Sequence, residues 1–169
     1  MSQPIRHELG DLDDVDVESI GEPGQRTFRF VAERRETTVS LWVEKEQLQS
    51  FAVLVEQYFA RAAGVSRGQD RAILTLAARF PSQATIDFKA GRMALGYDQG
   101  PGTFSLTAEE VGDPEASTQS VSCRIGAAQA QALCLKIAEI VSAGRPRCPL
   151  CGAPMEGKHV CPLSNGHAH

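Results

Sequence analysis

The sequence predicts an α+β fold in which two βββα repeats form an antiparallel sheet with helices on one face, followed by a small C-terminal zinc-ribbon-like module. Three observations lead to this prediction. Strand-like and helix-like hydrophobic patterns follow one another as three strands and a helix, this order occurs twice, and three cysteines gather near the end of the chain. Short connections between the strands favour antiparallel pairing.

Composition limits the class of protein. The chain has 169 residues, of which 42% are hydrophobic, so it can build one core and a short appendage. Only 22% of residues are charged and the net charge is -4, which disfavours nucleic-acid binding by bulk charge. The first residues lack the apolar stretch of a signal peptide, and no run is long enough to cross a membrane. We therefore expect a soluble, cytoplasmic protein.

An internal repeat organises the first 143 residues. Residues 27–33 recur 76 positions later as residues 103–109, and Gln47-Leu48-Gln49 recurs 82 positions later as Gln129-Ala130-Gln131. The difference of six positions indicates a loop insertion in the second copy, around residues 111–120, where the sequence is polar. We place repeat one at about 15–64 and repeat two at about 88–143.

Each repeat begins with strands. A first strand-like stretch ends in a turn at residues 21–24 in one copy and 100–102 in the other, both rich in glycine and proline. The next strand alternates, which predicts that one set of side chains faces the core: Phe28, Phe30, Ala32, Phe104, Leu106 and Ala108. A further strand is predicted at 37–43 and at 120–125, with Trp42 expected in the core.

A helix closes each repeat. Its buried stripe follows helical spacing, and every member of the first stripe has an apolar counterpart 82 positions later. The first stripe is Leu48, Phe51, Ala52, Val55 and Phe59, and the second is Ala130, Leu133, Cys134, Ile137 and Val141. The helices are expected to end near Gly64 and at Gly144, and a short extra helix is predicted at 70–80.

Residues 144–169 are predicted to form a zinc-binding tail. Cys148 and Cys151 with the following glycine have the spacing of a zinc knuckle, and Cys161 supplies a third thiolate. Where a zinc ribbon would have its fourth cysteine this chain has a serine, so the fourth ligand is a histidine. His159 is the first choice, because residues two apart on a strand project to the same side, and His167 is the alternative.

The expected cofactor is one structural Zn²⁺. The tail has too few large apolar residues to fold without a metal, and four ligands leave no open coordination position. Two other interpretations of the cysteines are reduced surface thiols and a redox pair of the thioredoxin type. A redox pair belongs at the start of a helix after a strand, whereas Cys148 follows the end of a predicted helix.

Several motifs together resemble one known family. They are residues 21–28, 44–47, 91–95 and 129–131, with the terminal Cys-Pro-Leu-Cys-Gly and His-Val-Cys-Pro sequences. This combination is similar to uncharacterised bacterial proteins catalogued as domain of unknown function 3090. The resemblance covers about residues 15–166 and implies a histidine at position 159. The connector between the repeats is shorter here, and the family carries no established activity.

The pattern favours a non-catalytic zinc-containing interaction or regulatory module with a protein partner. No catalytic dyad is recognisable, so an enzyme is disfavoured although not excluded. One alternative is an enzyme or small-ligand-binding protein that uses the groove between the repeats, with Arg26 and Arg92 binding an anion. Another is a weak nucleic-acid binder, in which the zinc knuckle is surrounded by three basic residues: Arg145, Arg147 and Lys158.

Overall fold

A computed structural model describes residues 3–22, 24–62, 84–112, 116–142, 148–153 and 160–163. Four predicted features lie outside these residues and are not tested by the structure. They are the helix at 70–80, the two helix ends at Gly64 and Gly144, the candidate ligands His159 and His167, and the basic residues around the tail.

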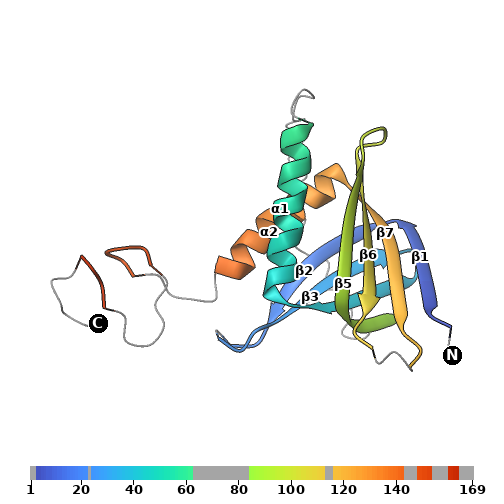
Figure 1. Ribbon diagram of the computed structural model, residues 1–169, viewed down its shortest axis with the longest axis horizontal. Helices are drawn as coiled ribbons and strands as arrows, with labels where there is room; N and C mark the ends of the chain where they lie inside the picture. Colours follow the sequence, from blue (N-terminus) through green and yellow to red (C-terminus); the bar gives the residue numbers. More distant parts are fainter. Residues whose placement is uncertain are drawn as a thin grey trace.

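Seven strands and two helices make up the described part of the body (Figure 1). The strands are β1 (Ile5–Asp11), β2 (Asp14–Ile20), β3 (Thr27–Arg34), β4 (Thr37–Val43), β5 (Ile86–Asp98), β6 (Thr103–Glu110) and β7 (Gln119–Gly126). The helices are α1 (Lys45–Arg61) and α2 (Ala127–Ser142). The α+β class is thus confirmed. Neither described helix is long and apolar enough to cross a membrane.

The seven strands form one mixed sheet in the order β1-β7-β6-β5-β4-β3-β2. The prediction of an antiparallel sheet is wrong, because β1 runs parallel to β7 and β4 runs parallel to β5. The hairpin pairs β2–β3, β3–β4, β5–β6 and β6–β7 are antiparallel. Only a long crossover can return a chain to the starting end of a strand, and the segment between β4 and β5, which contains α1, is such a crossover.

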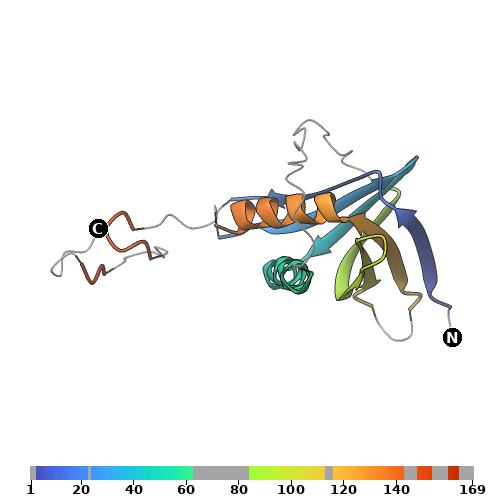
Figure 2. The same ribbon diagram turned by 90° about the horizontal axis from the view of Figure 1, so that it is seen from above.

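The two ends of this sheet are joined by two residues. β1 and β2 occupy opposite ends of the strand order, yet only Leu12 and Asp13 separate them in the chain. The N–H of Leu12 donates to the carbonyl of Arg124 on β7 at 3.0 Å, and the N–H of Asp13 donates to the carbonyl of Glu33 on β3 at 2.9 Å. The sheet therefore curls until its ends meet, as the crossing strands in Figures 1 and 2 show.

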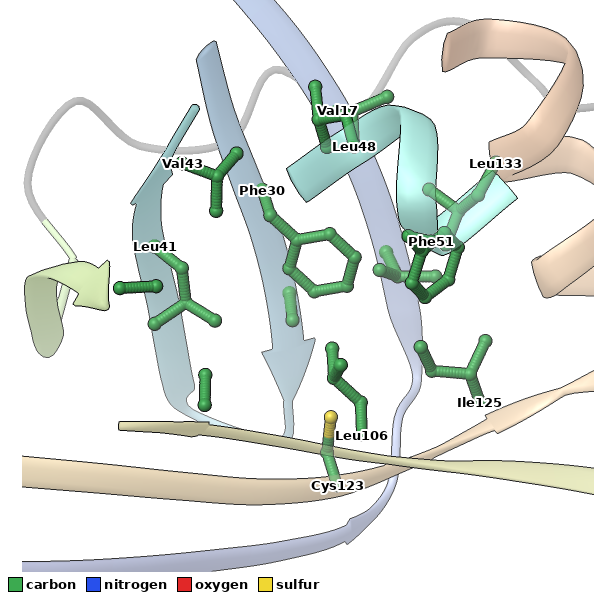
Figure 3. Close-up of a cluster of buried hydrophobic side chains, with 14 of the residues drawn as sticks. Val17, Phe30, Leu41, Val43, Leu48, Phe51, Leu106, Cys123, Ile125 and Leu133 are labelled. Carbon is green, nitrogen blue, oxygen red and sulfur yellow. The ribbon is translucent and has the colours of Figure 1, made fainter. Parts of the chain in front are cut away.

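One hydrophobic core fills the space inside the curled sheet. Side chains from β2, β3 and β4, from β6 and β7, and from both helices point toward one another there (Figure 3). The predicted helix stripes are confirmed as its helical contribution: most members are buried, while Ala52, Phe59 and Val141 pack at its margin. Phe30 is 1% exposed at the centre and packs edge-on against Phe51, with the ring centroids 6.2 Å apart.

Two glutamines fasten the helices to the sheet in the same way. The Gln47 side chain accepts a hydrogen bond from the N–H of Glu44 and donates to the carbonyls of Ala90 and Gly91 on β5. The Gln129 side chain accepts from the N–H of Gly126 and donates to the carbonyl of Leu12, next to β2. The repeat alignment pairs these two glutamines. The internal duplication of the chain remains a prediction, and the shared role of the two glutamines supports it.

Trp42 lies on the outer face of the sheet, so the prediction that it belongs to the core is wrong. Its ring N–H donates to a carboxylate oxygen of Asp87 on β5 at 2.8 Å, which holds the indole over β4 and β5. The Arg29 guanidinium lies 5.7 Å from the centre of the indole ring and also bonds to Glu18. An indole N–H needs an acceptor, and on the outer face Asp87 supplies it.

Candidate metal centre

Cys148 and Cys151 lie in a tight turn that the local sequence explains. The N–H of Gly152 donates to the carbonyl of Cys148 at 2.8 Å, and the N–H of Cys148 donates to the carbonyl of Ala153 at 2.9 Å. Gly152 has φ +70°, a backbone conformation that glycine adopts without strain. These two bonds fold the Cys-x-x-Cys-Gly segment back on itself.

The turn directs backbone N–H groups at sulfur. Hydrogen bonds from the N–H groups of Cys151 and Leu150 lower the pKa of the Cys148 thiol to about 6. Burial raises the pKa of Cys161, and a hydrogen bond from the N–H of Leu163 opposes that rise. The sequence Cys-Pro-Leu occurs at both places, and in both the N–H two residues after the first cysteine bonds to its sulfur.

The sulfur atoms of Cys148, Cys151 and Cys161 all lie within 4.8 Å of one another. Zinc binds thiolates at about 2.3 Å in a tetrahedron, which places two bound sulfurs about 3.8 Å apart. The cluster is therefore of the size that one metal ion requires. Cys148 and Cys161 are buried, at 3% and 2% exposed, and Cys151 is half-buried. Sequence spacing predicted this convergence, and the three thiols fit a soft metal such as zinc.

Comparison with known proteins places the chain in a family. Residues 7–161 match the family described as protein of unknown function, DUF3090. The chain belongs to this family. The matched region of this DUF3090 protein ends at Cys161, so it includes all three clustered cysteines and residue 159 and stops before residue 167. Neither the curated proteins nor the solved structures gave a match.

The other two cysteines of the DUF3090 protein lie apart from the cluster. Cys123 and Cys134 are 5% and 8% exposed, and both pack in the hydrophobic core as small apolar residues. Burial raises the pKa of the Cys123 thiol to about 12 and that of Cys134 to about 11. Both therefore stay protonated and unreactive at neutral pH.

Three apolar side chains beside the cluster were not assigned a role from the sequence. Leu150, Val160 and Leu163 are 53%, 68% and 67% exposed. Each is separated from a clustered cysteine by no more than one residue. Their position next to the cysteines is visible in the sequence, but their exposure is known only from the structure. Three exposed apolar side chains therefore lie close in sequence to the clustered cysteines.

The two arginines that we considered for anion binding do not meet. Arg92 on β5 lines a groove of about 420 Å³ between α1 and β5, and Arg26 is not among its lining residues. Arg26 precedes β3, and its Nε is buried without a hydrogen-bond partner within the described residues. A site that uses both guanidinium groups is therefore not present in this arrangement.

Proposed function

We propose that this DUF3090 protein is a non-catalytic interaction or regulatory module whose tail is held by one structural Zn²⁺. The observation that carries the proposal is the convergence of the Cys148, Cys151 and Cys161 sulfurs within 4.8 Å. With a histidine as fourth ligand, Cys₃His coordination fills the tetrahedron and leaves no position for a substrate. A filled site stabilises a fold but does not activate water.

His159 is our choice for the fourth ligand. It precedes Cys161 by two residues, and on an extended segment such residues project to the same side. The matched family region includes position 159 and not position 167. His167 remains the alternative. Thiolate ligands also need a reducing compartment, which favours the cytoplasm.

The exposed apolar residues support a protein partner. Leu150, Val160 and Leu163 are each more than half exposed and lie next to the three clustered cysteines in the sequence. Grouped and exposed apolar side chains on a small module are typical of protein contact sites. Nucleic-acid binding is the weaker alternative, because the net charge of the chain is -4.

Metal content and partner binding test the two parts of the proposal separately. Protein purified from zinc-replete medium should contain about one zinc per chain. Cys161→Ser should lose the zinc, and the core variant Cys134→Ser should keep it. Absence of stoichiometric metal would contradict the zinc site. Metal-dependent turnover that disappears in Cys161→Ser while the body stays folded would contradict the non-catalytic assignment.

The partner is tested by co-purification with the wild-type chain and with the double variant Leu150→Glu, Leu163→Glu. We expect one reproducible protein partner that the double variant loses while it retains zinc. Leu135→Glu is the matched control, because Leu135 is an exposed leucine on α2, 71% exposed. No reproducible partner, or equal capture by all three proteins, would count against an interaction module.

A further inference from the structure

A groove between α1 and β5 opens into the hydrophobic core. Its walls are one face of the first half of α1 and the middle of β5, which lie side by side (Figure 1). Its volume of about 420 Å³ falls within the range of small-molecule pockets, roughly 300 to 1,000 Å³. The lining residues are mainly apolar: Phe51, Leu54, Met93, Ala94, Leu95 and Leu106.

The corresponding inward-facing residues on the other side of the core are buried. The inward-facing residues Val15 and Val17 of β2 are 3% and 0% exposed in the part of the sheet against which α2 packs. On β5 the inward-facing residues Met93 and Leu95 remain partly exposed. The groove is therefore a feature of the α1 side, where the helix leaves core residues accessible.

The walls of the groove are fixed by hydrogen bonds. The Gln47 amide nitrogen donates to the carbonyl of Ala90 at 3.2 Å and to that of Gly91 at 3.1 Å, while its oxygen accepts from the N–H of Glu44. These bonds tie the first turn of α1 to β5 and use the polar atoms of the Gln47 side chain. The groove thus exists before any ligand arrives, and a preformed site loses less free energy on binding.

The rim carries one cation and one anion. Arg92 on β5 and Glu46 on α1 are both exposed, and neither has an ion-pair partner in the described part of the chain. A guanidinium beside an apolar floor binds a carboxylate through paired hydrogen bonds. Glu46 disfavours a second negative charge on its side of the groove.

We propose that the groove binds one small amphipathic carboxylate, with its apolar body against Phe51, Leu95 and Leu106 and its carboxylate against the Arg92 guanidinium. The apolar lining excludes a strongly polar ligand such as a nucleotide. Arg92, which has no ion-pair partner among the described residues, selects an acid over the matching alcohol or amine. This site is independent of the metal cluster and goes beyond the function proposed above.

Decanoate is the probe, titrated into the full-length, zinc-containing protein and followed by amide chemical shifts. We expect saturable binding to one site, with shift changes at α1 and β5. Arg92→Gln should weaken binding about tenfold, a typical loss for one charge-assisted contact. Glu46→Gln should leave the affinity equal or tighter. Leu54→Glu should abolish binding, and Leu135→Glu on the surface of α2 should not change it.

Chemical specificity gives a second readout. Decan-1-ol and decyltrimethylammonium share the apolar chain but lack the carboxylate, so both should bind at least tenfold more weakly than decanoate. Cys161→Ser should bind decanoate normally, so failure of the metal proposal and failure of the groove proposal are distinguishable.

Three results would overturn the proposal. The first is absence of saturable decanoate binding by the folded wild-type protein up to about 1 mM. The second is equal affinity in Arg92→Gln or equal binding of the alcohol. The third is a wild-type dimer that Leu54→Glu converts to a monomer, because the groove would then be covered by a second copy of the chain.

Discussion

Removal of the metal should unfold the tail and leave the body intact. The structure describes ten residues around the cysteine cluster, six in 148–153 and four in 160–163. Ordering a residue costs about 1 to 2 kcal/mol of conformational entropy, so these ten require about 10 to 20 kcal/mol. The source of that free energy decides whether the tail can fold alone.

Apolar burial supplies little of it. Leu150, Val160 and Leu163 are 53%, 68% and 67% exposed, so together they bury about as much as one complete side chain. Full burial of such a side chain contributes about 1.5 to 3 kcal/mol. A structural zinc contributes about 10 to 16 kcal/mol to a small module, which matches the remaining cost. Folding of the tail should therefore require the metal.

Amide correlation spectra of ¹⁵N-labelled protein test this directly, before and after a strong chelator and again after zinc is restored. The amides of Leu150, Val160 and Leu163 should move to random-coil positions on chelation and return with zinc, while those of the body stay in place. Cys161→Ser should resemble the chelated protein, and Cys134→Ser should not. Tail amides that keep their positions after elemental analysis shows metal loss would refute the reasoning.

Three further predictions concern the body, each measured by urea unfolding. Gln129→Ala should lower the free energy of unfolding by about 1 to 2 kcal/mol, because the N–H of Gly126 loses its acceptor; an equal loss in the exposed control Gln131→Ala would contradict this. Phe30→Ala, at a residue only 1% exposed, should cost about 3 to 5 kcal/mol; a cost below about 1 kcal/mol would mean that Phe30 is not central to the core. Burial raises the pKa of Asp16 in the folded state. The folded protein therefore favours the protonated carboxyl group, and it loses stability relative to the unfolded chain as the pH rises through the folded pKa. Asp16→Asn should therefore be more stable than the wild type near pH 7, with the difference vanishing at a pH below the unfolded value of 3.8; a difference that persists in acid would refute this origin.

Strands joined by tight turns were the most predictable elements. The strand predicted at 37–43 is β4, and those expected at 27–33 and 103–109 are β3 and β6, each one residue longer. Alternation of apolar residues reports which face is buried, and glycines at positive φ, such as Gly21 and Gly102, mark the turns. Both signals are local, so a single sequence carries them.

Non-local features were not predictable. β1 was not predicted, because Ile5–Asp11 contains four charged or titratable side chains and lacks a clear apolar alternation. Its only described strand partner is β7, which lies more than a hundred residues away in the sequence. The parallel pairs β1–β7 and β4–β5 depend on the path of the connections between strands. The spacing of hydrophobic residues gives no information about that path. Trp42 was misplaced because its large aromatic side chain suggested burial, although the alternation of Val39, Leu41 and Val43 assigns it to the opposite face.

The candidate sites also include one feature that the sequence predicts and one that it does not. Cysteine spacing is local, so convergence of Cys148, Cys151 and Cys161 could be predicted. A groove between the halves was anticipated with Arg26 and Arg92, but only Arg92 lines the groove that the structure contains. Its presence depends on how closely α1 approaches β5, and its lining combines residues about forty to sixty positions apart. The distance between α1 and β5 is set by the packing of their side chains and cannot be predicted from the spacing of residues in the sequence.

The pairing of β1 with β7 has a consequence for synthesis of the protein. A chain leaves the ribosome from its N-terminus, so Ile5–Asp11 emerges more than a hundred residues before its partner Gln119–Gly126. β2, β3 and β4 can form hairpins at once, since their partners are adjacent in the chain. β1 can therefore dock only after β7 has been made, so this pairing closes the sheet late in the folding of the body.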